Sequence, residues 1–146
     1  MQILCPECGA VLNEGNSCQS IFETLLALEF TDPGYGEVHM LTVACFMIQH
    51  GRYSDAALAW IEQKLRDVVE GVPAGYIRRQ ASKEAGSGSR AWKVTRQPGD
   101  RRLPRVAWSM TISDVAANYQ DAQSYCRLVK QWARVTLDEM SGTYGR

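Results

Sequence analysis

Hydrophobic residues recur every three or four positions in three stretches of the first half of the chain, the spacing that places them on one face of a helix. The first stretch covers residues 18–30 and is followed at residues 31–34 by Thr-Asp-Pro-Gly, a sequence that ends a helix. The second covers residues 36–49, where apolar positions occupy much of the helix circumference and predict burial on several sides. The third covers residues 54–69. These helices predict a helical core over residues 18–70.

The pattern of the second half is less regular. Glycine, proline and serine interrupt residues 71–110, which we predict to form a loop and a small β-hairpin. The strands of this hairpin are expected at residues 91–96 and 105–110, joined by a Gln-Pro-Gly-Asp turn. Helical spacing returns over residues 111–140 and predicts a C-terminal helix that can break near Asn118. The fold class that follows is mainly α, with the small β-hairpin before the last helix.

Two cysteines near the N-terminus carry the clearest chemical signal. Cys5 and Cys8 are separated by two residues and followed by Gly9, and so tight a loop can direct both sulfurs to one tetrahedral metal ion. We therefore predict a structural zinc site. The alternatives for the pair are a redox-active Cys-x-x-Cys, a secreted disulfide framework, or thiols that are simply buried. A redox motif would open a helix after a strand, and five cysteines are an odd number for a disulfide framework, so these two are disfavoured.

Helix geometry selects the remaining ligands. His39 and His50 are eleven residues apart on one predicted helix, about 16 Å at 1.5 Å per residue, so they cannot bind the same ion. If the first two helices fold back on each other at the Asp-Pro-Gly turn, Cys18 lies beside His50 at the open end, where the N-terminal loop can reach. His39 lies at the closed end. The predicted ligands form a closed Cys₃His set: Cys5, Cys8, Cys18 and His50.

His39 has no role in this zinc site. The simpler interpretation is a partly buried histidine bonded to a carboxylate or to a helix-end carbonyl. The functional interpretation is a second polar site, in which His39 and Glu29 transfer a proton or bind a metal. A third alternative has His39 replacing Cys18 as a zinc ligand. Cys45 and Cys126 are expected in the core.

Length and composition are those of a single domain, residues 1–146. The chain is 45% hydrophobic and 22% charged, which is enough apolar material for a buried core. We divide it into a zinc loop (1–17), the helical core (18–70), a basic loop with the hairpin (71–110) and the C-terminal helix (111–140). No apolar run is long enough to cross a membrane and no targeting segment is visible, so we expect a cytoplasmic protein without a membrane partner.

The net charge of zero conceals an asymmetry. Residues 1–76 carry three basic and ten acidic side chains, a net charge of −7, whereas residues 77–108 carry nine basic and two acidic ones, a net charge of +7. We expect the two parts to neutralise each other within one fold. The alternative is an anionic partner such as nucleic acid, bound through residues 78–105. The candidate anion-binding residues are Arg78, Arg79, Arg101, Arg102 and Arg105.

Several of these motifs occur together in a known family. The matching strings are Cys5-Pro6-x-Cys8-Gly9, Asp32-Pro33-x-Tyr35, Val38-His39-x-Leu41-Thr42-Val43, Gln49-His50, residues 108–115 and residues 129–134. In these strings the chain resembles a family of small, uncharacterised bacterial proteins, common in actinobacteria, that is classed only as a domain of unknown function. The resemblance covers most of the chain and supports the predicted fold, but it implies no activity.

We therefore predict a zinc-stapled helical domain, in which bound zinc cross-links separate parts of the chain. A closed four-ligand site leaves zinc no open position for water or substrate, so we expect a non-enzymatic binding module. It would act as an adaptor or regulator of a protein partner, with nucleic acid as the other candidate. The alternative is a small enzyme with a polar site around His39 and Glu29.

Overall fold

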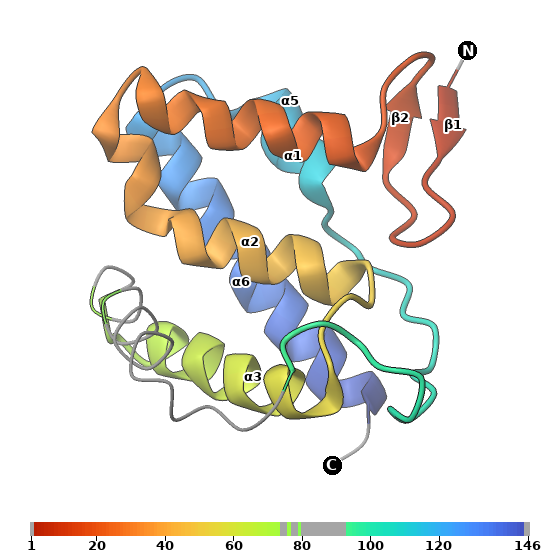
Figure 1. The fold of residues 1–146 in the computed structure, drawn as a ribbon. Coiled ribbons are helices and arrows are strands. Elements are labelled where there is room, and N and C mark those ends of the chain that lie inside the picture. Colours follow the sequence, from red (N-terminus) through yellow and green to blue (C-terminus); the bar gives the residue numbers. More distant parts are fainter. Residues whose placement is uncertain (1, 74–75, 77–78, 80–92, 145–146) are drawn as a thin grey trace.

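The structure is a computed structural model that describes residues 2–73, 76, 79 and 93–144. Helices dominate it, so the mainly α prediction is confirmed (Figure 1). Two strands come first, β1 (Gln2–Leu4) and β2 (Val11–Asn13). The helices are α1 (Cys18–Ala27), α2 (His39–Gln49), α3 (Asp55–Val69), α5 (Ile112–Asn118) and α6 (Ala122–Tyr144), with the short 3₁₀ helices η1 (Leu28–Phe30) and η2 (Pro33–Val38) between α1 and α2.

The helices begin where short polar side chains can accept the free backbone N–H groups of the first turn. Ser17 and Ser20 form a reciprocal capping box at the start of α1. At the start of α3, the Ser54 hydroxyl accepts the Ala57 N–H at 3.1 Å. Both starts agree with the helices predicted from the sequence.

Two helical segments differ in detail from the predicted ones. The chain before α2 forms the 3₁₀ helix η2, because the Asp32 carboxylate accepts the Gly34 N–H at 2.9 Å and starts a tight turn there. The predicted C-terminal helix is divided into α5 and α6. Tyr119 is extended between them (φ −73°, ψ 147°), and the Asp121 carboxylate then accepts the Ser124 N–H at 2.8 Å to start α6. The break therefore lies where the sequence allowed one.

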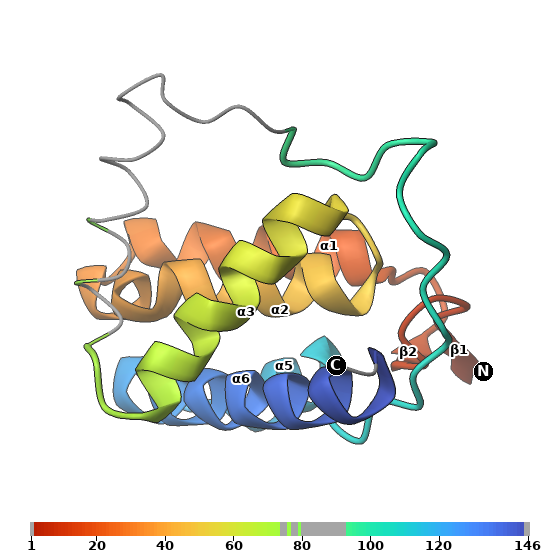
Figure 2. The ribbon, with the colours of Figure 1, turned by 90° about the horizontal axis from the view of Figure 1, so that it is seen from below.

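The helices pack in two layers. α1 and α2 form one layer, α5 and α6 form the other, and α3 crosses beside α2 and α6 (Figures 1 and 2). α6 contributes the fully buried Tyr125 and Trp132 to the core. Buried hydrogen bonds join it to α2, from Thr42 to Tyr125 at 3.0 Å and from the Gln49 amide to Thr136 at 3.0 Å. Among the described helices, none combines the length and the apolar character that crossing a bilayer requires.

The small sheet lies elsewhere than predicted. β1 and β2 pair antiparallel at the N-terminus, so a small β-hairpin is present, but it precedes the first helix (Figure 1). The predicted hairpin between residues 91–96 and 105–110 is wrong for the residues that the structure describes; its first two residues lie outside them. Residues 93–96 run beside the loop before α3, where Thr95 pairs with Tyr53.

Backbone hydrogen bonds explain this correction. The Ser54 N–H donates to the Val94 carbonyl and the Arg96 N–H donates to the Arg52 carbonyl, each at 2.8 Å. These bonds occupy the groups that the predicted hairpin needed. The basic segment is thereby fixed against the loop between α2 and α3.

Candidate metal centre

Four side chains from separate parts of the N-terminal half converge beside the hairpin. Cys5 and Cys8 come from the loop between β1 and β2, Cys18 is the first residue of α1, and His50 directly follows α2. All four are buried, and their potential ligand atoms lie within 4.8 Å of one another. The Cys5 Sγ is 3.7 Å from the His50 Nε2, and the Cys8 Sγ is 3.6 Å from the Cys18 Sγ. The structure thus brings together the four residues that the sequence predicted.

The loop that carries the thiol pair is a tight turn held by its own backbone. The Gly9 N–H donates to the Cys5 carbonyl at 2.9 Å, and the Cys5 N–H donates to the Ala10 carbonyl at 2.8 Å. Gly9 has a φ of 80°, a left-handed conformation that a residue with a Cβ adopts only under strain. The turn leaves both sulfurs on its inner side, facing Cys18 and His50.

The imidazole of His50 is oriented by the residue one helical turn earlier. Its Nδ1 donates to the Phe46 carbonyl at 2.7 Å, and its ring packs on the Phe46 ring with centroids 4.4 Å apart. With the proton on Nδ1, the lone pair of Nε2 faces the sulfurs, which is the form of histidine that binds a metal. The sequence analysis did not assign Phe46 a role, although its i, i+4 spacing from His50 was visible.

The close contacts within the cluster shift the pKa values of its thiols and of its imidazole. The hydrogen bond with Cys18 lowers the pKa of Cys8 to about 4 although burial opposes ionisation. The same contact, together with burial, raises the pKa of the Cys18 thiol. Burial opposes protonation of His50, but hydrogen bonds to Cys8 and to the Phe46 carbonyl raise its pKa to about 9. Because thiols and imidazolium bind a metal only after losing their protons, a bound cation would displace the protons that these groups carry.

The distances suit a tetrahedral ion. For metal–sulfur bonds of about 2.3 Å, neighbouring ligands of a tetrahedron lie about 3.8 Å apart. The 3.6 Å between the Cys8 and Cys18 sulfurs and the 3.7 Å between the Cys5 sulfur and the His50 nitrogen are close to this edge length, and all four atoms lie within 4.8 Å of one another. An ion bound by all four donors would have closed coordination, with no position left over for water.

The pair of His39 and Glu29 lies at the opposite end of α2. The His39 Nδ1 and the Glu29 Oε2 are 2.6 Å apart, and the two side chains are 31% and 17% exposed. No third potential metal ligand joins them in the part of the chain that the structure describes. The contact links η1 to the start of α2, which agrees with the simpler interpretation of His39 as a partly buried histidine bonded to a carboxylate.

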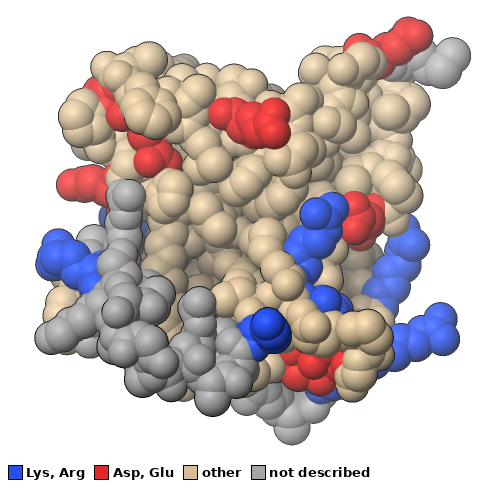
Figure 3. Space-filling model, viewed as in Figure 1, with Lys and Arg blue, Asp and Glu red and all other residues tan. Residues whose placement is uncertain are grey.

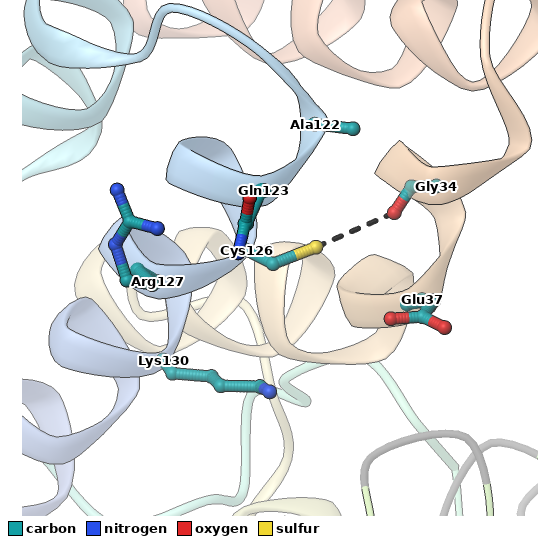
Figure 4. Close-up of a pocket in the computed structure, with 7 residues that line it drawn as sticks. All are labelled: Gly34, Glu37, Ala122, Gln123, Cys126, Arg127 and Lys130. Carbon is teal, nitrogen blue, oxygen red and sulfur yellow. Dashed lines mark hydrogen bonds between the residues drawn. The ribbon is translucent and has the colours of Figure 1, made fainter.

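The remaining cysteines occupy different surroundings. Cys45 is fully buried, as predicted, and burial raises the pKa of its thiol to about 12. Cys126 is only partly buried and donates to the Gly34 carbonyl at 3.3 Å. It lines a surface pocket of about 420 Å³ between η2 and α6, beside Glu37 and Lys130 (Figure 4). Burial and the nearby Glu37 carboxylate raise the pKa of this thiol, so it is not a ready nucleophile.

The basic segment contacts the acidic half of the chain. Asp55 accepts from the Arg96 guanidinium at 2.6 Å and from the Arg101 N–H at 2.9 Å, and these contacts hold the pKa of its carboxyl below the usual value. The Arg105 guanidinium donates to the Pro6 carbonyl in the metal loop at 3.1 Å.

The other candidate anion-binding residues remain on the surface or outside the structure. Arg79 and Arg102 are exposed, and Arg78 lies outside the described residues. Figure 3 shows acidic and basic side chains side by side on the lower part of one face. The described arginines thus divide between contacts within the fold and exposure to solvent.

Comparison with known proteins places the chain in a family. Residues 3–141 match the family described as a family of unknown function (DUF5946), so the chain belongs to that family. The resemblance noted in the sequence is thereby confirmed for an uncharacterised domain of unknown function. No curated protein and no solved structure matches the chain.

Proposed function

We propose that this member of the DUF5946 family is a zinc-stabilised, non-enzymatic binding module, an adaptor or regulator that acts on another protein. The observation that carries the proposal is the closed Cys₃His cluster, whose four buried donors lie within 4.8 Å of one another. A metal with four protein ligands has no open position at which to activate water or polarise a substrate. The ion would then have a structural role, holding the hairpin against α1 and α2.

Zinc is the proposed ion because of the donor set. Three thiolates and one imidazole are soft and borderline ligands, whereas magnesium and calcium bind oxygen ligands. Zinc binds such sulfur and nitrogen ligands in tetrahedral geometry. The proton on His50 Nδ1, held by the Phe46 carbonyl, leaves the right nitrogen free for it.

The ion would join the hairpin to α1 and α2, which already contact each other through the stacked rings of Phe22 and Phe46, 4.1 Å apart. The strands of the hairpin are three residues long each, and an isolated hairpin is at best marginally stable in water. Cys5 and Cys8 would connect this hairpin to the start of α1 through Cys18 and to the end of α2 through His50. Metal binding and ordering of the hairpin are therefore coupled.

A protein partner is favoured over nucleic acid by the contacts of the basic segment. Arg96, Arg101 and Arg105 are engaged with Asp55 and with the metal loop. Guanidinium groups already paired within the fold offer less to a phosphate backbone. The five cysteines are free, which fits the reducing conditions of the cytoplasm, the location we propose.

A small enzyme built on His39 and Glu29 is the second candidate. The 2.6 Å contact between them is short and partly exposed, as in a proton-transfer pair. Neither residue lines the 420 Å³ pocket of Figure 4 or the pocket beside the hairpin. Neither of these two pockets could therefore present a substrate to the pair.

Capture of the partner tests the proposed function. The tagged protein is purified from its host with and without nuclease, and bound proteins are identified by mass spectrometry. A stoichiometric protein that survives nuclease and is lost from Cys8→Ser supports the module. Retention of nucleic acid alone, or bound partners that do not depend on the metal site, would contradict it.

A further inference from the structure

The outer edge of β1 is an open strand edge with apolar side chains. In an antiparallel ladder, successive residues alternate in pointing their backbone groups toward and away from the partner strand. Cys5 bonds inward to Ala10, so Leu4, one residue earlier, points its N–H and C=O away from β2. Within the residues that the structure describes, no third strand covers this edge. β1 lies at the rim of the molecule, with β2 between it and α1 (Figure 1).

Soluble proteins usually protect such an edge with lysine, proline or a bulge. β1 reads Gln-Ile-Leu and has none of these. Ile3 is 48% exposed, Leu4 is 65% exposed, and Val11, opposite Leu4 on the neighbouring strand, is 50% exposed. Among the described residues these are three of the five large hydrophobic side chains that are exposed, and they gather on one small hairpin.

A pocket adjoins this edge. It has a volume of about 290 Å³ and is lined by Ile3, Leu4 and Leu12 from the hairpin, by Phe46 from α2, and by three residues of the candidate metal centre, Cys5, Cys18 and His50. A strand added beside β1 would point every second side chain to the pocket side of the sheet. An aliphatic side chain would enter it between Ile3, Leu4 and Phe46, beside the candidate metal ligands. Its rim includes Arg52, whose guanidinium is 3.3 Å from the Glu7 carboxylate.

The charge of the residues around the β1 edge indicates which kind of partner segment it would bind. The first 51 residues contain six carboxylates and no lysine or arginine. On the face shown in Figure 3, acidic side chains lie over α1 and at the outer end of the hairpin. Among the described residues, two arginines, Arg52 and Arg105, contact its loop, at Glu7 and at the Pro6 carbonyl. An extended segment with lysine or arginine beside its apolar residues is therefore complementary to this surface.

We propose that the outer edge of β1 and the adjoining pocket bind an extended, basic segment of a partner protein, which adds to the hairpin as a third strand. Main-chain hydrogen bonds to Leu4 would provide affinity, and the pocket would select an aliphatic side chain. This proposal rests on the proposed binding function and names its docking surface. The metal would fix the position of the edge, since Cys5 directly follows β1.

Binding of a designed peptide tests the surface. The probe is a fluorescein-labelled nine-residue peptide that alternates valine with lysine, and its control has glutamate in place of lysine. We expect the lysine peptide to bind at least about tenfold more tightly in fluorescence polarisation. In ¹⁵N-resolved spectra the Leu4 amide should shift on binding. Absence of binding, or shifts confined to other elements, would overturn the proposal.

Two matched variants locate the contact. Leu4→Lys places a charge on the edge, and Phe30→Lys makes the same change at a side chain that is 94% exposed in η1, away from the hairpin. The first should weaken peptide binding about tenfold or more, and the second by less than about twofold. If Leu4→Lys loses its metal, Val11→Lys replaces it. Equal binding by the hairpin variant and the control overturns the proposal.

Two further outcomes separate this inference from the proposed function. Sedimentation that shows a dimer abolished by Leu4→Lys would overturn it, because the edge would then serve a second copy of this chain. If the partner captured from the host is retained equally by wild type and Leu4→Lys, the binding function stands and the β1 edge is not its docking surface. If wild type captures no protein, the proposed function itself fails.

Discussion

His50 illustrates how single residues prepare the candidate metal centre. The Phe46 carbonyl, one turn earlier on α2, accepts the Nδ1 proton at 2.7 Å and so fixes which nitrogen faces the sulfurs. His39, on the same helix, has its Nδ1 beside the Glu29 carboxylate at 2.6 Å. The two histidines at the ends of α2 are therefore held by different neighbours, His50 by a backbone carbonyl and His39 by a carboxylate.

The two histidines give the first prediction. His50→Ala should reduce zinc affinity by more than about 100-fold, because it removes a ligand from a closed site. His39→Ala should leave zinc affinity within about threefold, since it breaks only the contact with Glu29. Zinc competition with a colorimetric chelator measures both. The reverse outcome would show that the N-terminal loop binds at the other end of α2.

Asp55 gives a second prediction, through the pH dependence of stability. Its pKa is lowered by the Arg101 N–H and by the Arg96 guanidinium, so the stability that its carboxylate provides is present above the unfolded pKa and is lost as pH falls through the lower folded value. Asp55→Asn should therefore lower the melting temperature by a few degrees, by the same amount at every pH from about 5 to 8.

Asp138→Asn on α6 is the control for this change, since Asp138 is exposed and the substitution removes the same charge. It should melt close to the wild-type temperature throughout. A difference between Asp55→Asn and wild type that shrinks between pH 8 and pH 5 would contradict the lowered pKa.

At the scale of whole elements, the helices were predictable from the sequence and the strands were not. Apolar spacing and the caps Ser17 and Ser54 locate α1 and α3 because both signals are local. β1 and β2 are only three residues long, too short for an alternating pattern. Residues 93–96 do have one, but their backbone bonds go to a loop 40 residues away, which no local pattern reports.

The candidate metal centre was predictable for the same physical reason as the helices. The rise of a helix separates His39 from His50, and the turn between α1 and α2 brings Cys18 to the same end as His50. The positions of Arg96 and Arg101 on Asp55 were not predictable in this way, since they depend on the course of an irregular segment. Charge balance predicted that the basic part is neutralised within the fold, but it did not identify Asp55 as the carboxylate.

The basic segment gives a third prediction, from two neighbouring arginines. Arg101 approaches Asp55 through its side chain at 3.7 Å, whereas Arg102 is exposed. Arg101→Glu should lower the free energy of unfolding by about 1 kcal/mol, because an attraction becomes a repulsion at a partly exposed site. Arg102→Glu should change it by less than about 0.5 kcal/mol. Chemical denaturation measures both values, and equal effects would contradict the contact.

For the molecule as a whole, the metal centre lies at one end of the α1–α2 pair, and the helical core extends away from it. Tyr125 and Trp132 of α6 are fully buried, and Tyr125 contacts Thr42 and Tyr35, neither of which belongs to the Cys₃His cluster. The hairpin, by contrast, is attached through the buried Leu12 and Ala10 and through contacts of its loop with Arg52 and Arg105, to which a metal would add. Loss of the metal should therefore loosen the hairpin and the adjoining ends of α1 and α2, and leave the rest of the helical core folded.

Removal of zinc gives the fourth prediction. Chelation should accelerate amide hydrogen exchange in β1, β2 and the residues around Cys18 and His50, while α6 keeps its protection and most of the helical circular dichroism remains. Exchange monitored by mass spectrometry before and after chelation checks this. Global unfolding would show that the core depends on the metal, and unchanged exchange in the hairpin would show that it does not need one.

The most direct test of the central claim is X-ray absorption at the zinc edge, on protein purified without added metal. The closed Cys₃His site predicts one zinc per chain with three sulfur neighbours at about 2.3 Å and one nitrogen at about 2.0 Å. Cys8→Ser should lose this signal. A coordination shell that includes a water oxygen would contradict the closed, non-catalytic site, and protein without zinc under reducing conditions would contradict the site altogether.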